Sequence, residues 1–240
     1  MTDRTPLLRV SPDEVARLAL VVGDPARAER VAARLDDARQ VGSFREFVTF
    51  TGAHRGTPVT VSSHGVGAAG AALCFEELHQ AGVRRMIRAG TCGGLRPEIG
   101  DGDLIVATGA VRDDGFTDRL VPPAFPALAS VDVVTSLRRT LAEAGHRGHE
   151  GVVLTSAVFY SHDVLGSSLE QWARAGAVAV EMECAALFVI GALRDMEVGA
   201  LLAVDGNPLH RAEGGYDPHR GVVRDAVDVM VGFALDALVA

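Results

Sequence analysis

Short apolar runs that end in glycine or aspartate alternate with amphipathic stretches of helical length along most of this chain. Such alternation is typical of α/β proteins, because each strand is followed by a helix that covers the sheet. Predicted strands are 18–22, 58–62, 85–88 (ending at the glycines from Gly90 on), 103–107, 151–156, 177–180 and 199–204; predicted helices are 26–35, 68–80, 131–144, 167–174, 183–194 and 219–238. No linker or shift in composition interrupts the pattern. We therefore predict a mixed β-sheet flanked by helices, in a single domain over residues 1–240.

The charged residues restrict what this chain can bind. It has 31 acidic and 23 basic residues among 240, a formal net charge of −8, which argues against nucleic acid or an anionic membrane as a partner. Every basic residue is arginine and none is lysine. Schiff-base or lysine-base chemistry is therefore excluded. Any bound anion must be held by guanidinium groups, backbone N–H groups or helix N-termini.

Other composition features indicate an ordinary intracellular protein. Three cysteines are too few for a disulfide framework, and the first residues lack the layout of a signal peptide. We expect a cytoplasmic location and no membrane span. His146 and His149 have no third ligand nearby, so we predict no metal site.

Residues 65–70, Gly-Val-Gly-Ala-Ala-Gly, form a complete G-x-G-x-x-G between a predicted strand and a predicted helix. This is the dinucleotide-binding pattern, but the acid expected about 20 residues later, on the ribose hydroxyls, is missing. Arg88-Ala89-Gly90-Thr91 stands there instead. The alternative is that these glycines serve a tight turn and close helix packing.

Two arginines follow predicted strands at what should be the same edge of the sheet. Arg27 comes just after Gly23-Asp24-Pro25, where an arginine gains nothing from the helix dipole, and Arg88 ends an apolar strand shortly before Thr91. Together with free N–H groups they suit a phosphate. Arg27 could instead point into solvent, and Arg88 could be a structural partner of a nearby acid.

Three carboxylates occupy comparable positions. Glu181 and Glu183 lie at a strand-to-helix switch, where a carboxylate can bind the vicinal hydroxyls of a ribose. Capping of the helix N-terminus is the alternative, and it explains one glutamate better than two. Asp205 ends another apolar strand before Gly206, where an ordinary Asp-Gly turn is the simpler interpretation.

In this order the motifs resemble the nucleoside phosphorylase family, the branch with uridine phosphorylase and hexameric-type purine nucleoside phosphorylase. The matching motifs are Gly-Asp-Pro-x-Arg at 23–27, Arg-Glu-Phe at 45–47, His-Gly-x-Gly at 64–67, Ile-Arg-x-Gly-Thr-Cys-Gly at 87–93 and Val-Glu-Met-Glu at 180–183. The resemblance covers nearly the whole chain from about Leu18. It implies a glycosyltransferase of nucleoside salvage in which phosphate attacks C1′ of a ribonucleoside. The products are free base and ribose 1-phosphate.

The resemblance also implies roles for individual residues. Phosphate would be held by Gly23, Arg27, Arg88 and Thr91, with Arg45 reaching it from a neighbouring subunit of a homo-oligomer, dimer-based and up to a hexamer. Ribose would be bound by Met182 and Glu183, and the base pocket would be lined by Cys92, Gly93, Phe159, Val180 and Glu181. The catalytic residues would be Asp205, Arg88 and Glu183. No cofactor is implied, because phosphate is the co-substrate.

The identity of the base stays open between purine and uracil. Asp205 stands where purine-cleaving relatives carry the acid that protonates N7, whereas Asp163 and Leu165 replace the uracil-binding glutamine and arginine of uridine phosphorylases. Residues 111–115 and 125–127 look more like the uridine branch. We favour a purine on general-acid grounds.

Further alternatives concern the sugar and the reaction. Leu7 or Leu8 stands where relatives carry a histidine on the ribose 5′-hydroxyl, which leaves a 5′-deoxy or 5′-alkylthio substrate open. Residues 206–218 are rich in glycine, proline and charge and could close over a ligand. A hydrolytic nucleosidase would not need three arginines, and a non-catalytic nucleoside sensor would use Asp205 only as a turn residue.

Overall fold

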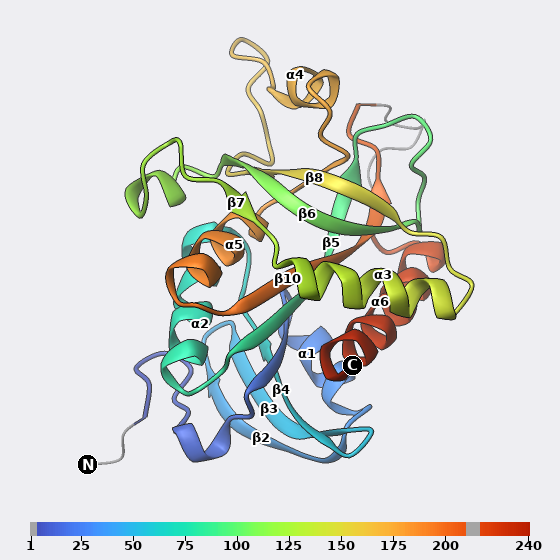
Figure 1. Cartoon of the computed structure of the whole chain (residues 1–240). Coiled ribbons are helices and arrows are strands. Elements are labelled where there is room, and N and C mark those ends of the chain that lie inside the picture. Colours follow the sequence, from blue (N-terminus) through green and yellow to red (C-terminus); the bar gives the residue numbers. More distant parts are fainter. Residues whose placement is uncertain (1–3, 210–216) are drawn as a thin grey trace.

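The computed structural model describes residues 4–209 and 217–240 (Figure 1). Its strands are β1 Leu18–Val22, β2 Asp36–Phe44, β3 Phe47–His54, β4 Thr57–Ser63, β5 Arg85–Gly94, β6 Leu104–Asp113, β7 Ala127–Leu128, β8 His149–Ser156, β9 Ala179–Glu181 and β10 Glu197–Gly206. Its α-helices are α1 Pro25–Ala32, α2 Ala68–Gln80, α3 Val131–Glu143, α4 Leu169–Arg174, α5 Cys184–Leu193 and α6 Gly221–Val239. Short 3-10 helices lie at Pro12–Glu14 and Thr117–Arg119. No helix in the described ranges is long and apolar enough to cross a membrane.

The strands form one mixed sheet in the order β10-β6-β8-β9-β5-β1-β4-β3-β2, with β7 beside β6. Because β10 also pairs with β5, the first five strands of this order close into a ring, from which β1, β4, β3 and β2 extend. Strands β1, β4, β5 and β10 run parallel to one another, so their carboxyl ends point to the same edge. This edge is where a ligand is expected in an α/β sheet.

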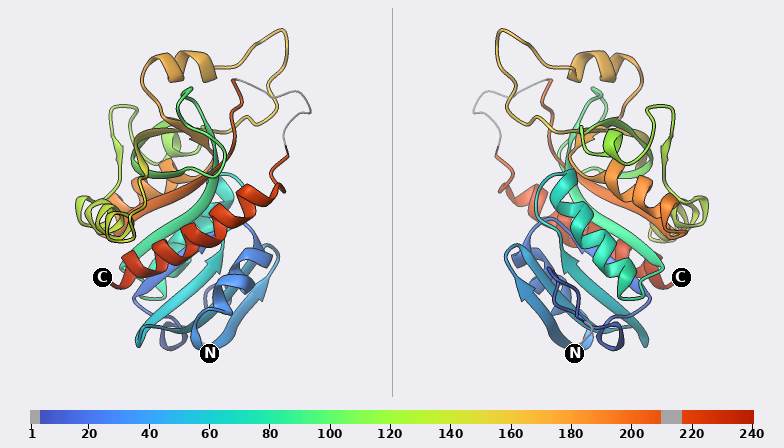
Figure 2. Two further views of the ribbon diagram at one scale, coloured as in Figure 1. Left: turned by 90° about the vertical axis from the view of Figure 1, so that its right-hand side faces the viewer. Right: turned by 90° about the vertical axis from the view of Figure 1, so that its left-hand side faces the viewer.

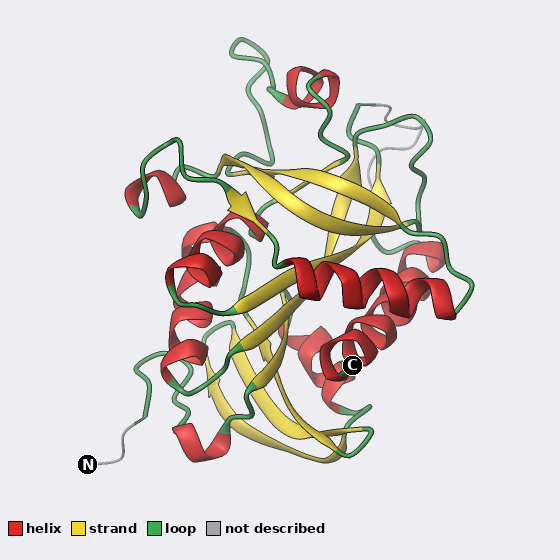
Figure 3. Cartoon of the chain, in the orientation of Figure 1, coloured by secondary structure: helices red, strands yellow, loops and turns green. Residues whose placement is uncertain are grey.

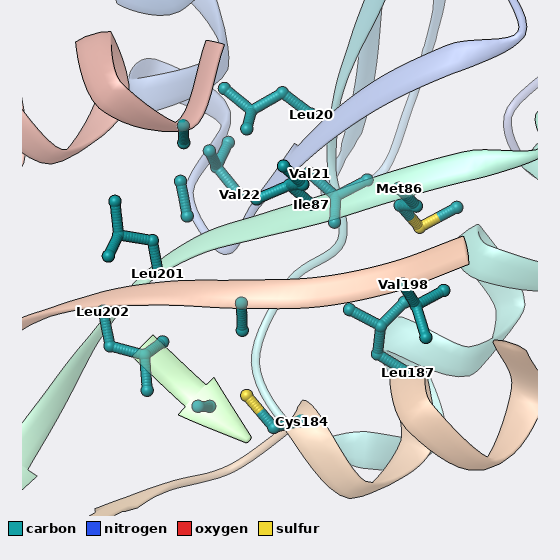
Figure 4. Packing of buried hydrophobic residues seen from close by; sticks show 14 of the residues in the cluster. Leu20, Val21, Val22, Met86, Ile87, Cys184, Leu187, Val198, Leu201 and Leu202 are labelled. Carbon is teal, nitrogen blue, oxygen red and sulfur yellow. The ribbon is translucent and has the colours of Figure 1, made fainter. Parts of the chain in front are cut away.

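Helices cover both sides of the central strands (Figure 3). α2 packs against α5 on one side of β5 and β10, and α3 packs against α6 on the other (Figure 1). The buried core between them includes Leu20, Ile87 and Leu201 from neighbouring strands and Leu187 from α5 (Figure 4). α5 is apolar all round, and accordingly eight of its ten residues are buried.

The structure and the comparisons reported below confirm the predicted mixed sheet flanked by helices, whereas the prediction of a single domain over 1–240 stays a prediction. The sequence pattern missed β2 and β3. The first five residues of β2 are exposed and give no apolar signal, and only the first three residues of β3 are buried. It also ended the third strand too early. That strand, β5, continues through its glycines to Gly94, because β10 pairs with it on one side and β9 on the other.

Candidate active site

One large cavity lies at the carboxyl ends of the parallel strands, with a volume of about 1230 Å³. Strands β1, β4, β5 and β10 each supply residues within or just beyond their C-terminal halves, and β9 with the segment after it supplies Val180 to Glu183. The loop before α4 and the β5–β6 connection project from this same end of the molecule, opposite the C-terminus (Figure 2).

Most residues that the sequence singled out line this cavity: Gly23, Arg27, Arg88, Thr91, Cys92, Gly93, Phe159, Val180, Glu181, Met182, Glu183 and Asp205. The continuation of β5 explains how they come together. β9 runs antiparallel to β5, with Val180 opposite Gly93, so the following residues run back beside the Arg88 end of β5. The glycine-containing end of β5, which the sequence prediction left out of the strand, therefore places Glu181 and Glu183 beside Arg88.

Arg88 is a buried cation that bridges two carboxylates. Its side chain is 5% exposed, and its guanidinium contacts Glu183 and lies 3.6 Å from Glu181. Burial opposes its charge, but the two carboxylates outweigh burial and raise the pKa of Arg88. Among the described residues its Nε and Nη1 atoms have no hydrogen-bond partner. Arg88 is thus paired with acids, as the structural alternative required, yet it keeps two buried N–H groups for another acceptor.

Glycine at position 90 makes room for this guanidinium. A Cβ added there would overlap Arg88, with Cζ at 2.6 Å and Nη2 at 2.9 Å. The backbone at Gly90 needs no positive φ, so space rather than conformation excludes a side chain here.

The two glutamates have separate tasks. Glu181 accepts hydrogen bonds from the N–H groups of Glu183 and Cys184 at 2.7 and 2.9 Å and from Thr155 Oγ1 at 2.5 Å, so it caps the start of α5. Burial raises the pKa of Glu181. Glu183 makes no cap; burial opposes its charge, but Arg88 outweighs burial and lowers its pKa. The capping alternative therefore fits Glu181, and Glu183 is the carboxylate aimed at the cavity.

The glycine-rich turn at 65–70 holds Glu183. The backbone N–H of Gly67 donates to Glu183 Oε1 at 2.6 Å, so the start of α2 meets a carboxylate of the chain itself. Gly65 and Gly67 have φ values of 74° and 95°, as a tight turn requires. A Cβ at Gly70 would meet nothing within 4 Å, so the expectation of close helix packing at the third glycine is wrong.

Arg27 points into the cavity and not into solvent. Asp24 caps α1 by accepting from Ala26 N at 3.0 Å, and Pro25 is the first helical residue, which places Arg27 in the first turn beside Gly23. Burial, with Arg88 nearby, lowers the pKa of Arg27. Its Nε is buried and has no hydrogen-bond partner among the described residues.

Asp205 is held within a strand, so the expectation of a simple Asp-Gly turn is wrong. β10 continues to Gly206, and its register against β5 shifts between Val204 and Gly206, which places Asp205 in a β-bulge with 5% exposure. Bulges of this kind redirect side chains near active sites. Arg220, which sequence reasoning missed, donates to the backbone carbonyl of Asp205 at 3.2 Å and also bonds Asp101.

The part of the cavity formed by loops is more exposed. Phe159 is 56% and Tyr160 88% exposed, with their rings 4.9 Å apart in an edge-to-face contact. Only Phe159 of the two lines the cavity, together with Val158 and Ser161 from the same loop. Asp163 and Leu165 are not among the lining residues. Cys92 is buried, and burial raises its pKa, so it contributes a neutral thiol.

Arg45, which is predicted to contribute to a neighbouring subunit, and Leu7, which stands near the position of the missing histidine, are not among the residues that line the cavity of their own chain. Arg45 is exposed in the turn between β2 and β3, with a φ of 56° and its guanidinium near the ring of Phe44. Leu7 is anchored through its backbone N–H, which lies 3.0 Å from both carboxylate oxygens of Glu77. Of the predicted 206–218 closing segment, residues 210–216 lie outside the described residues.

No cluster of three or more metal-ligating side chains occurs in the described parts of the chain. Arg220 and Asp101 line the cavity and His64 lies behind it, and sequence reasoning gave none of the three a role. His64 stood inside a quoted motif. Asp101 and Arg220 stood outside every quoted motif, although Arg220 comes just after the 206–218 segment that the sequence analysis singled out.

Comparisons with known proteins place these residues in a family. A family model described as the phosphorylase superfamily matches residues 17–239. A purine nucleoside phosphorylase of Plasmodium falciparum is 36% identical over 231 residues, 96% of this chain and 94% of that protein. A uridine phosphorylase of Treponema pallidum is 36% identical over 227 residues, 91% and 88% of the two chains. The crystal structure of a Toxoplasma gondii purine nucleoside phosphorylase in complex with immucillin-H has a TM-score of 0.95 at 32% identity, covering 99% and 96%.

The chain therefore belongs to the phosphorylase superfamily, as an enzyme of the nucleoside phosphorylase family. Family membership implies a nucleoside and phosphate as its substrates. The resemblance drawn from the sequence motifs is confirmed.

Proposed function

We propose that this enzyme cleaves purine ribonucleosides by phosphorolysis, giving a free purine and ribose 1-phosphate. The observation that supports a purine is Asp205, a buried carboxyl group on the wall of the cavity, held in a β-bulge and fixed through its backbone by Arg220. A carboxyl group so placed can protonate a leaving purine at N7. The purine nucleoside phosphorylase relatives are consistent with this choice.

Phosphate would bind between Arg27 and Arg88, with the hydroxyl of Thr91 and the backbone beside Gly23 completing the set. The unpartnered Nε atoms of both arginines support this assignment, because buried N–H groups are normally paired. Two guanidinium groups neutralise the dianion and orient one oxygen toward C1′.

Ribose would lie against Met182, with its hydroxyls on Glu183. As the C1′–N bond breaks, its electron pair goes to the base and positive charge develops on the ribose; a phosphate oxygen then forms the new bond to C1′. Asp205 donates a proton to the leaving base. The base would lie among Cys92, Gly93, Phe159 and Val180. Glu181 would support the site by capping α5.

We further propose that Arg45 completes the phosphate site of a neighbouring subunit. Its exposure and its place outside its own cavity support a contribution in trans. The enzyme would then act as a homo-oligomer, and we place it in the cytoplasm, where its three free buried cysteines stay reduced.

Uridine is the second candidate substrate, because the Treponema pallidum uridine phosphorylase is as similar to this chain as the Plasmodium falciparum enzyme. A side-by-side assay of inosine, adenosine, uridine and 5′-methylthioadenosine, each with and without phosphate, tests the proposal. We expect phosphate-dependent release of base from a purine nucleoside. Release independent of phosphate would indicate a hydrolase, release from uridine alone would overturn the purine assignment, and no release would favour a sensor.

A further inference from the structure

His64 is a buried side chain at the site to which the proposed reaction gives no role. It follows β4, is fully buried, and its ring packs edge-on against Phe75 with centroids 5.5 Å apart. Its backbone N–H donates to Val22 O at 2.8 Å. The main chain is therefore held by β1 and the ring by Phe75.

The hydrogen bonding of the ring determines its tautomer. Nδ1 lies 2.8 Å from the carbonyl oxygen of Gly65. A carbonyl only accepts hydrogen bonds, so Nδ1 must carry the proton and Nε2 of the neutral ring must be an acceptor. Burial, with Arg88 nearby, lowers the pKa of His64 to about 4, which keeps the ring neutral at pH 7.

That acceptor has no partner among the described residues, although it is buried. The ring lies beside the phosphate-site residues: a Cβ added at Gly23 would be 3.8 Å from His64 Cε1, and the charges of Arg88, Glu183 and Arg27 all act on the ring. The other unpartnered buried atoms of the described chain are Arg27 Nε, Arg88 Nε and Arg88 Nη1. One acceptor and three donors, all without partners, thus share one region of the site.

Substrate binding would change which groups are available to pair with Arg88. In this structure Arg88 is held by Glu183. In the proposed reaction Glu183 turns to the ribose hydroxyls, and Arg88 loses this partner at the moment when it must hold phosphate. A neutral acceptor beside Arg88 can replace the carboxylate without drawing the guanidinium away from a dianion.

We propose that His64 is a positioning residue for phosphate: its Nε2 accepts a hydrogen bond from Arg88 when nucleoside and phosphate are both bound, and so keeps the guanidinium directed at phosphate. The inference rests on the proposed function. His64 does not line the cavity, so it acts through Arg88 and does not touch substrate itself.

Two substitutions separate this role from a structural one. His64→Asn keeps an N–H near the position of Nδ1, and so the bond to Gly65, but has no atom at the position of Nε2. His64→Gln can bring a carbonyl oxygen to the position of Nε2. We expect His64→Asn to raise the phosphate KM about tenfold, as the loss of a hydrogen bond to a charged group does, with the nucleoside KM within about twofold. His64→Gln should recover most of the loss.

The opposite order would overturn the proposal: if His64 only shapes the Gly65 turn, His64→Asn behaves like wild type and His64→Gln is impaired. Equal changes in both KM values would also overturn it. Thermal unfolding of each variant shows whether it is folded. If wild type releases base without phosphate, the proposed function itself fails; if wild type needs phosphate and His64→Asn has a normal phosphate KM, only the His64 inference fails.

A measurement on the wild type needs no variant. In ¹⁵N-histidine-labelled enzyme, the Nε2 resonance of His64 should move upfield when inorganic phosphate is added together with a C-nucleoside, whose carbon–carbon glycosidic bond cannot be cleaved. Acceptance of a hydrogen bond causes this shift. An Nε2 resonance unchanged in the presence of both ligands would contradict the proposal.

Discussion

The cavity has two parts that differ in how they are built. The buried part, with Arg88, Glu183 and Asp205, is formed by strands and is almost closed to solvent. The loop part, with Val158 and Phe159, is formed by the connection between β8 and α4 and is mostly exposed. The first is held by strand pairing and hydrogen bonds between charged groups, and the second by few contacts.

The difference indicates that the two parts of the cavity serve different steps, one the reaction itself and the other the choice of base. The buried part would handle phosphate and ribose, which every nucleoside phosphorylase must bind. The loop part, with Asp205 at the boundary, would meet the base, in which substrates differ. Relatives named for purine and for uridine are equally identical to this chain. Overall identity therefore identifies the reaction better than the base.

The strongest test of the buried part is Arg88→Ala. We expect kcat/KM for phosphate to fall about 10³-fold, because a preorganised charged donor is lost, while the nucleoside KM changes much less. Breaking the buried pair should also cost about 3–5 kcal/mol of folding stability, since Glu181 and Glu183 stay buried without their cation. Steady-state kinetics in each substrate and thermal unfolding measure the two effects.

The matched control is Arg138→Ala, which removes an exposed arginine paired with Glu150. It should leave both KM values unchanged. Equal changes of the phosphate and nucleoside KM in Arg88→Ala would show that Arg88 shapes the whole site and does not serve phosphate.

Asp205→Asn tests the boundary between the two parts. If Asp205 protonates the leaving purine, purine turnover should fall about 10²-fold at neutral pH, as general acids commonly contribute, with the phosphate KM little changed. Parallel assays on inosine and uridine measure this. Unchanged purine turnover would show that Asp205 is not the general acid, and a residue of the loop part would then have to activate the base.

The buried part was largely predictable because its residues follow apolar strands. Arg27, Arg88, Glu183 and Asp205 each come at or just after such a run, and parallel strands bring their carboxyl ends to one edge. What sequence could not provide is pairing. That β5 continues through Gly90 and Gly93 follows only from its neighbours β9 and β10, because glycines carry no strand preference of their own.

The sequence also failed to predict other parts of the fold and site, because their roles depend on neighbours in space or their apolar pattern is weak. β2 has an exposed first half, so its apolar pattern is too weak to distinguish it from a loop. His64 lay inside a recognised motif, but its lack of a partner for Nε2 depends on the three-dimensional arrangement of Arg88 and Gly65. Arg220 precedes α6 and meets Asp205 only through the fold.

Gly90→Ala disturbs the buried part without removing any charge. The added methyl group would overlap the Arg88 guanidinium and displace it, so we expect the phosphate KM to rise about tenfold, roughly one hydrogen bond to a charged group. Gly70→Ala is the control, because a Cβ there meets nothing within 4 Å and the residue lies in α2. It should keep normal kinetics and gain about 0.5–1 kcal/mol of stability. Similar kinetics for the two variants would refute the steric role of Gly90.

Phe159→Ala tests the loop part, and the expected effect is the smallest. An aromatic face that stacks on a base contributes about 1–3 kcal/mol, and the 56% exposure of Phe159 favours the lower end. We therefore expect the nucleoside KM to rise about fivefold, with the phosphate KM unchanged. Val164→Ala is the control, since Val164 lies in the same loop, is 83% exposed and does not line the cavity, so it should leave both KM values unchanged. A larger effect of Phe159→Ala on phosphate than on nucleoside would mean that the loop closes over the buried part, and the division of the cavity into two independent parts would fail.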